Sequence, residues 1–249
     1  MCVWQETEAK RGSCEVASAV LEFLKTSCDL KKYDTIHTFS DSCGGQNRNK
    51  NVISMFMYVC ETTNIQEWTH TFLESGHSYL PNDTDFGKIE KSKAKQTKIE
   101  NFNGWVDLIK LHGFNVIEMG GKVKDINEIQ KNLTFRNTNF DNDKFSWLKI
   151  RSLKVTKTNP GVMYYKCKHD PDAEFQSVDF SKTGSKPMSD ISLRPLYTEP
   201  IKISYEKYID MQSFRSLVPP SVAEEFQNLP HTVKKGSNIE LLPDEDTGV

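Results

Sequence analysis

The sequence has no apolar run that approaches the roughly 18 residues of a membrane-spanning helix. Residues 1–11 contain no basic segment followed by an apolar stretch, which is the pattern of a secretory signal. The six cysteines form no C-x-x-C pair, so the spacing of a zinc cluster is missing. We therefore expect an intracellular protein with reduced thiols and no membrane partner.

Charge is segregated along the chain, although its sum is small. The 32 Lys and Arg residues and the 34 Asp and Glu residues give a formal net charge of −2, which provides no global attraction to nucleic acid. In contrast, residues 144–168 contain seven Lys or Arg and no acidic residue, and residues 88–98 contain five lysines and one glutamate. These two segments are the candidates for local contact with a polyanion.

Apolar spacing and turn residues predict alternating helices and strands. The first part should contain a helix at 13–27, a strand at 34–40, a helix at 52–64 and a strand at 67–73. Short connections between strand, helix and strand predict a βαβ unit with parallel neighbouring strands. Further on we expect helices at 83–97, 101–112, 125–133, 204–217 and 220–226, and strands at 115–119, 145–155, 162–167 and 175–180.

Asp41 follows the first strand of the βαβ unit and precedes the pair Gly44-Gly45. Sites in parallel sheets lie at the carboxyl ends of the strands, and glycines let a ligand approach the backbone closely. The position favours a metal-binding carboxylate, while an Asx turn or a helix cap is the structural alternative. Position alone leaves the two interpretations open.

Other acidic residues are candidates for the same site. Asp83 and Asp85 open the helix after the second strand, where they are either caps or ligands. Two carboxylates within about 4 Å of a shared Mg²⁺ or Mn²⁺ would form the oxygen-rich site that activates water for phosphodiester cleavage. Glu15, on the helix before Asp41, is a candidate third ligand, and His77 is either a proton shuttle or a loop histidine bonded to backbone.

The order of these features resembles the back half of the RNase H-like nuclease fold. Four blocks, at 4–13, 40–49, 72–78 and 83–90, are similar to an uncharacterised, transposase-derived domain family that occurs in many copies in invertebrate genomes. The resemblance covers roughly residues 3–165. The D-x-C-x-G-Q-N-x-N and G-H-S…D-x-D-F blocks are specific together and weak singly.

This resemblance implies an α/β fold, an incomplete RNase H-like mixed sheet with flanking helices and a β-rich C-terminal appendage. We expect a partial core at 1–135, a β-rich and helical extension at 136–228 and a disordered tail at 229–249. Only a few residues precede the first helix, so we expect the strand with the first catalytic aspartate to be missing. That would leave an open sheet edge through which the chain self-associates.

The resemblance also implies roles. Asp41 would be the second catalytic aspartate, Asp83 the third with Asp85 as its rival, and Glu15 the helix glutamate. The implied activity is nuclear, Mg²⁺- or Mn²⁺-dependent cleavage or strand transfer of DNA. The alternative is a catalytically dead module, left from a transposable element, that binds nucleic acid or protein.

Two groups of basic residues are candidates for holding DNA. Lys88, Lys91, Lys95 and Lys98 are expected on one side of the helix after Asp83, or simply on a solvated helix face. The second group interleaves with aromatic residues on predicted strands and suits a phosphate backbone with stacked bases. This second group consists of Lys149, Arg151 and Lys154. The structural alternative for it is a solvated strand face over an aromatic core.

Overall fold

The chain divides into two compact units in the computed structural model, which describes residues 1–74, 76, 79–96 and 98–233. The sheet unit comprises Arg11–Pro81 and Lys122–Leu196. The helical unit comprises Met1–Lys10, Asn82–Gly121 and the described residues from Tyr197 onward. None of the helices in the described segments has the length and apolarity needed to cross a membrane.

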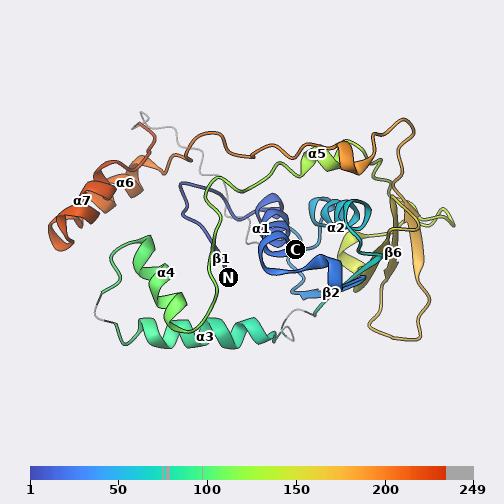
Figure 1. The fold of residues 1–249 in the computed structure, drawn as a ribbon, viewed down its shortest axis with the longest axis horizontal. Coiled ribbons are helices and arrows are strands. Elements are labelled where there is room, and N and C mark those ends of the chain that lie inside the picture. Colours follow the sequence, from blue (N-terminus) through green and yellow to red (C-terminus); the bar gives the residue numbers. More distant parts are fainter. Residues whose placement is uncertain (75, 77–78, 97, 234–249) are drawn as a thin grey trace. The chain divides into compact units, whose positions relative to one another are not determined.

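A five-stranded mixed sheet organises the sheet unit (Figure 1). In spatial order its strands are β2 (Thr35–Ser40), β3 (Glu67–Phe72), β5 (Ser152–Thr156), β6 (Val162–Lys166) and β7 (Gln176–Asp179). Strands β2 and β3 are parallel neighbours, which confirms the predicted βαβ unit. The other three pairings are antiparallel.

Helix α2 (Lys50–Thr62) packs on one face of this sheet. Helices α1 (Ser13–Ser27) and the short α5 (Asn127–Gln130) pack against α2. Helix α2 begins where the Asn49 side chain accepts a hydrogen bond from the Val52 amide at 3.2 Å, which is the usual role of asparagine at a helix start. Three 3₁₀ turns, η1 (Leu30–Lys32), η2 (Trp147–Lys149) and η3 (Met188–Asp190), complete the unit.

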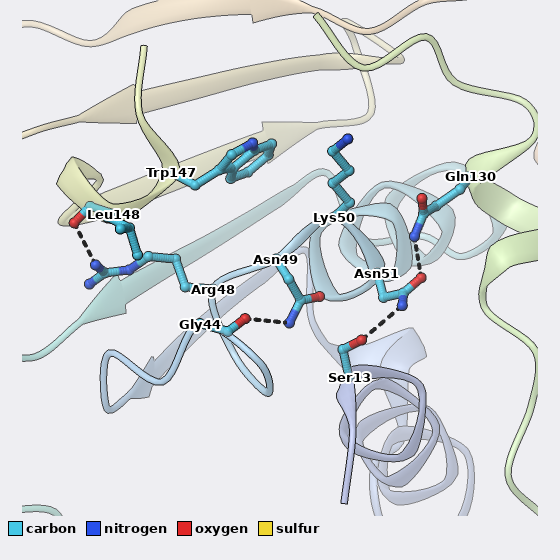
Figure 2. Close-up of a pocket in the computed structure, with 9 residues that line it drawn as sticks. All are labelled: Ser13, Gly44, Arg48, Asn49, Lys50, Asn51, Gln130, Trp147 and Leu148. Atoms are coloured by element: carbon cyan, nitrogen blue, oxygen red, sulfur yellow. Dashed lines mark hydrogen bonds between the residues drawn. The ribbon is translucent and has the colours of Figure 1, made fainter. Parts of the chain in front are cut away.

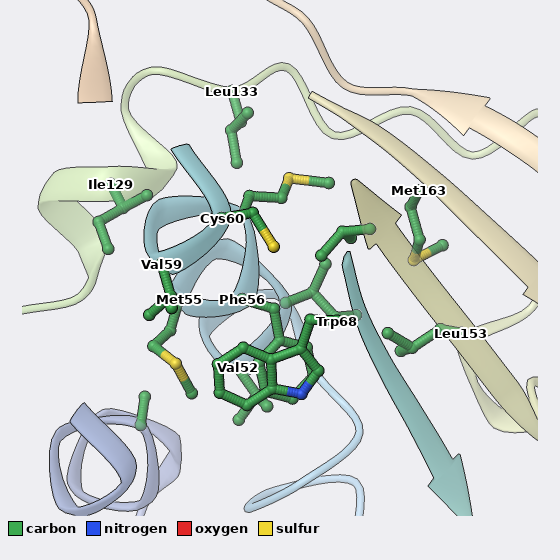
Figure 3. Close-up of a cluster of buried hydrophobic side chains, with 14 of the residues drawn as sticks. Val52, Met55, Phe56, Val59, Cys60, Trp68, Ile129, Leu133, Leu153 and Met163 are labelled. Carbon is green, nitrogen blue, oxygen red and sulfur yellow. The ribbon is translucent and has the colours of Figure 1, made fainter. Parts of the chain in front are cut away.

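The core of the sheet unit lies between α2 and the sheet (Figure 3). Phe56 of α2 stacks on Trp68 of β3 with ring centroids 4.3 Å apart. Leu153 and Met163 bring β5 and β6 into the same cluster, and all four side chains are fully or almost fully buried. Burial of this apolar surface is the main force that holds helix and sheet together.

The strands of the expected C-terminal extension belong to this sheet. Backbone pairing joins β3 to β5, with Trp68 opposite Val155. The expected boundary at residue 135 therefore falls inside the sheet unit, and residues 152–179 are continuous with the sheet instead of forming an appendage. The physical reason is that the inward side of β5 to β7 is apolar and needs the same core as β2 and β3.

Strand order also differs from the simplest RNase H-like expectation. That fold places three antiparallel strands before the first helix, whereas the antiparallel strands here, β5, β6 and β7, follow the βαβ unit. Strands β2 and β7 are the edges of the sheet. Self-association through an open edge stays a prediction.

The helical unit is built from short elements. They are β1 (Cys2–Val3), β4 (Ile117–Glu118), α3 (Pro81–Lys93), α4 (Phe102–Leu111), α6 (Tyr205–Ser213), η4 (Arg215–Leu217) and α7 (Pro220–Gln227). Strands β1 and β4 pair in parallel. A small apolar cluster of Ile89, Leu108 and Ile109 joins α3 to α4. Of the tail expected at 229–249, residues 234–249 lie outside the described part of the chain.

Candidate functional site

Asp41 lies at the carboxyl end of β2, as the sequence predicts, and is exposed. Its Oδ1 accepts hydrogen bonds from the Cys43 amide at 3.3 Å and from Asn47 Nδ2 at 2.5 Å. A carboxylate that accepts from the amide two residues later makes an Asx turn. The structural alternative left open by the sequence is therefore present, because this carboxylate shapes the loop between β2 and α2.

A hydrogen-bonded chain behind Asp41 links the core to the end of β2. Trp68 Nε1 donates to Thr38 Oγ1 at 2.8 Å, and Thr38 Oγ1 lies 2.7 Å from His70 Nδ1. His70 Nε2 lies 3.0 Å from Ser40 Oγ, which donates to the Asp41 carbonyl at 2.7 Å. Because the Ser40 hydroxyl is committed to that carbonyl, a neutral His70 protonated on Nε2 satisfies every member.

The charge state of His70 follows from its surroundings. Burial, and to a smaller extent the positive charge of Arg48, lowers the pKa of His70 to about 4. The ring also packs edge-on against Phe72. His70 is therefore neutral near pH 7 and ties β3, on which it lies, to the Thr38 and Ser40 hydroxyl groups of β2.

Arg48 is a buried cation beside the same loop, with 6% of its surface exposed. Its Nη1 donates to the Leu148 carbonyl at 2.6 Å, its Nη2 donates to Ser42 Oγ at 2.7 Å, and its guanidinium lies over the Phe72 ring. Its Nε is buried without a hydrogen-bond partner. Burial and the neighbouring Arg151 lower the pKa of Arg48, while Asp41 opposes that shift.

Glu15 has a structural role that the resemblance does not anticipate. Its Oε2 accepts a hydrogen bond from the Gly12 amide at 3.0 Å, so the side chain caps the helix on which it lies. The residue is 3% exposed. A carboxylate that closes its own helix start is poorly suited to serve as a metal ligand.

The other acidic candidates belong to the helical unit. Asp83 and Asp85 lie in the first turns of α3, and Asp85 pairs with Lys88 at 2.9 Å. Their convergence with Asp41, a residue of the sheet unit, stays a prediction. His77 lies outside the described residues.

The described residues do not supply a complete set of ligands for a divalent cation. No group of three or more His, Cys, Asp or Glu side chains among them has the arrangement of a metal site. In the sheet unit Asp41 is engaged in its loop and Glu15 in its helix cap. These residues by themselves do not fit the Mg²⁺ or Mn²⁺ site that the resemblance implies.

The lysine group of the helical unit is less regular than predicted. Helix α3 ends at Lys93, so Lys88 and Lys91 lie on it, while Lys95 lies in the following turn and Lys98 beyond it. The reason is that Ile89 is the buried residue of α3, and the next large apolar side chain, Ile99, comes ten residues later. Lys98 instead pairs with Glu100 at 2.7 Å.

The strongest grouping of candidate side chains is on the sheet face opposite α2, here called the open face. A row of paired residues crosses all five strands: His37, Thr69, Lys154, Tyr164 and Ser177. Every one of these side chains is at least partly accessible, and their chain neighbours on β3, β5 and β6 are buried, as is Val178 on β7. The open face is therefore a polar and aromatic surface on a rigid sheet.

Aromatic rings and lysines meet on the open face. Lys154 Nζ lies 5.6 Å from the ring centre of Tyr164 and 5.0 Å from that of Phe175, and Lys166 Nζ lies 4.7 Å from Phe175. Phe39 of β2 is 60% exposed, an unusual state for a phenylalanine on a strand. Such rings offer stacking surfaces with positive charge beside them.

Ion pairs reduce the charge of the predicted basic group. Arg151 Nε lies 3.3 Å from Glu74, and Lys154 Nζ lies 3.4 Å from Glu67. Lys149, on η2, is exposed. The face is thus moderately and not strongly positive, and its aromatic side chains distinguish it from an ordinary solvated strand face.

Sequence reasoning missed Phe39, Phe175 and Arg48. The exposure of Phe39 was detectable in principle, because side chains along a strand point alternately to the two faces of the sheet. Ile36 and Thr38 face inward, so Phe39 faces outward. No local pattern marks Arg48 as buried. No protein-family model, curated protein or solved structure significantly matches this chain.

Proposed function

We propose that this chain binds single-stranded nucleic acid on the open face of its five-stranded sheet. The observation that carries the proposal is the cluster of Lys154, Tyr164, Lys166 and Phe175, with the exposed Phe39 on the same side of the sheet. Bases stack on aromatic rings, and lysines neutralise the phosphates between them. Stacking requires unpaired bases, so a single strand fits this surface better than a duplex.

Tyr164 provides the sharpest test. The Tyr164→Ala substitution removes a central ring and should weaken binding of a labelled oligothymidine about tenfold, because stacking contributes about 1–3 kcal/mol per base. Fluorescence anisotropy measures the dissociation constant. Tyr164→Phe retains the ring and should bind like the unmodified chain.

Phe23→Ala is the matched control, because Phe23 is an exposed aromatic residue of the sheet unit that lies on α1, on the helix side of the sheet. Its loss should leave the affinity unchanged. Equal effects of the Phe23 and Tyr164 substitutions, or no binding by the unmodified chain, would contradict the proposal.

Metal-dependent DNA cleavage, the activity implied by the resemblance to transposase-derived RNase H-like domains, stays a second prediction. Its support is the position of Asp41 at the carboxyl end of a parallel strand. It predicts that Mg²⁺ or Mn²⁺ allows the chain to nick supercoiled DNA and that Asp41→Asn abolishes nicking. Binding without nicking would favour the non-catalytic module.

A further inference from the structure

A pocket of about 420 Å³ lies in the sheet unit, on the helix side, away from the open face (Figure 2). Its walls come from the loop after β2, the start of α2, α5, η2 and the start of α1. The residues that line it are Ser13, Gly44, Arg48, Asn49, Lys50, Asn51, Gln130, Trp147 and Leu148. Its size is within the range of small-molecule sites, roughly 300–1,000 Å³.

The charged side chains that line the pocket are all positive. Arg48 and Lys50 are cationic, and none of the nine lining residues carries a carboxylate. Arg48 is buried, its Nε has no hydrogen-bond partner, and no ion pair to a carboxylate is present for it among the described residues. Asp41 acts on this buried cation from beyond ion-pair distance, and an anionic ligand in the pocket would further offset the cost of its burial.

Helix α2 adds a second attraction for an anion. The first amides of a helix have no acceptor within the helix, and the aligned peptide dipoles place partial positive charge there. Asn49, Lys50 and Asn51 are the residues at this start, and they line the pocket. Phosphate groups bind at such positions.

Side-chain hydrogen bonds hold the lining in place. Asn51 Nδ2 donates to Ser13 Oγ at 2.8 Å, and Gln130 Nε2 donates to Asn51 Oδ1. Asn49 Nδ2 donates to the Gly44 carbonyl at 3.3 Å. These contacts join α1, α2, α5 and the loop after β2 around the pocket, so a ligand would meet a preformed site.

Trp147 supplies an aromatic wall. Its indole packs on Phe180 and Phe145, remains partly accessible and lines the pocket on the same side as Lys50 (Figure 2). A planar ring next to a phosphate site is the combination that recognises a base and a phosphate together.

We propose that this pocket binds a mononucleotide, with its phosphate at the start of α2 near Arg48 and Lys50 and its base against Trp147. The site is distinct from the open face and does not depend on it. The class of ligand follows from three features that converge in one cavity: a cationic lining without a carboxylate, a helix amino end and an aromatic wall.

Isothermal titration calorimetry with AMP, adenosine and inorganic phosphate tests the proposal on the full chain. AMP should bind more tightly than either fragment, because each fragment lacks one of the two contacts. Lys50→Ala should weaken AMP about tenfold, the usual effect of losing one charge-assisted contact. Trp147→Leu should reduce AMP binding about tenfold, towards the affinity for phosphate.

Lys31→Ala is the control, since Lys31 is exposed on η1 and does not line the pocket. Thermal unfolding of each variant verifies that it is folded. No AMP binding by the unmodified chain, or AMP binding that neither Lys50→Ala nor Trp147→Leu changes, would overturn the proposal. Equal affinity for AMP and phosphate would overturn the assignment of a nucleotide. Tyr164→Ala should leave AMP binding intact, which separates this test from that of the open face.

Discussion

His70 is the buried titratable side chain that should make stability depend on pH. Its pKa is lowered to about 4 in the folded chain, mainly by burial, whereas a histidine in an unfolded chain has a pKa of about 6.5. The folded state therefore disfavours the proton. The contribution is fully present above the unfolded value and is lost as the pH falls from about 6.5 towards 4, because the unfolded state then binds more protons.

The unfolding free energy should consequently fall by up to about 3 kcal/mol through His70 as the pH drops from 7 to 4. Urea unfolding at a series of pH values measures this change. His70→Gln should flatten that part of the profile, while His169→Gln, at an exposed position, should preserve it. A His70→Gln profile as steep as that of the unmodified chain would refute this account.

At the residue scale, the sequence predicts where a side chain lies in the fold better than it predicts the hydrogen bonds that the side chain makes. The strand Thr35–Ser40 and the glycines after it place Asp41 at a strand end, and this is correct. The hydrogen bond that Asp41 accepts from Asn47 was not predictable, because it depends on how the loop between β2 and α2 turns back on itself. The cap formed by Glu15 was detectable only from its spacing to Gly12.

Among the structural elements, the turn between β5 and β6 depends on Gly161. This glycine has a positive φ of 75°, and its carbonyl accepts from the Phe180 amide at 2.9 Å. A Cβ there would lie 2.6 Å from Ser181 Oγ and 3.2 Å from the Ser181 backbone nitrogen. A side chain would therefore face both an unfavourable conformation and a clash.

Gly161→Ala should destabilise the sheet unit by about 2–4 kcal/mol, measured by urea unfolding. Gly184 provides the matched control, since its φ is also 75° but a Cβ there would meet no atom within 4 Å. Gly184→Ala should cost only the conformational part, about 1–2 kcal/mol. Equal losses at the two positions would show that the Ser181 contact has no effect.

Local elements were predictable, and distant pairings were not. The segments Glu67–Phe72 and Val162–Lys166 are rich in β-branched and aromatic residues, so both strands follow from sequence alone. A local pattern does not specify which strand lies next to another, so nothing in the sequence places β5 beside β3. The sequence therefore does not reveal that the strands after residue 135 share one sheet with β2 and β3.

At the scale of the whole molecule, two surfaces of the sheet unit carry separate proposals. The open face offers rings and lysines to a single strand, and the pocket at the start of α2 offers a cationic lining to a mononucleotide. Core packing between α2 and the sheet keeps the two sites on opposite sides of one rigid layer. The acidic residues of α3 belong to the helical unit, so a nuclease site shared with Asp41 is a matter for the cleavage assay.

Contact between the lysines of the open face and phosphate should also make the affinity for nucleic acid depend on salt concentration. Lys154→Gln removes one cation next to Tyr164 and Phe175, so the slope of log affinity against log salt should decrease by about 0.7, the value for one phosphate contact on a single strand. Anisotropy titrations at several salt concentrations give the slope. An unchanged slope would mean that Lys154 does not contact phosphate.

Photo-crosslinking with a single strand that contains 5-iodouracil, followed by mass spectrometry, tests the central claim most directly. If bases stack on the open face, the cross-links should fall on Phe39, Tyr164 and Phe175, whose rings are accessible on that side of the sheet. Cross-links confined to the helical unit, or none above the level of a denatured sample, would contradict the account.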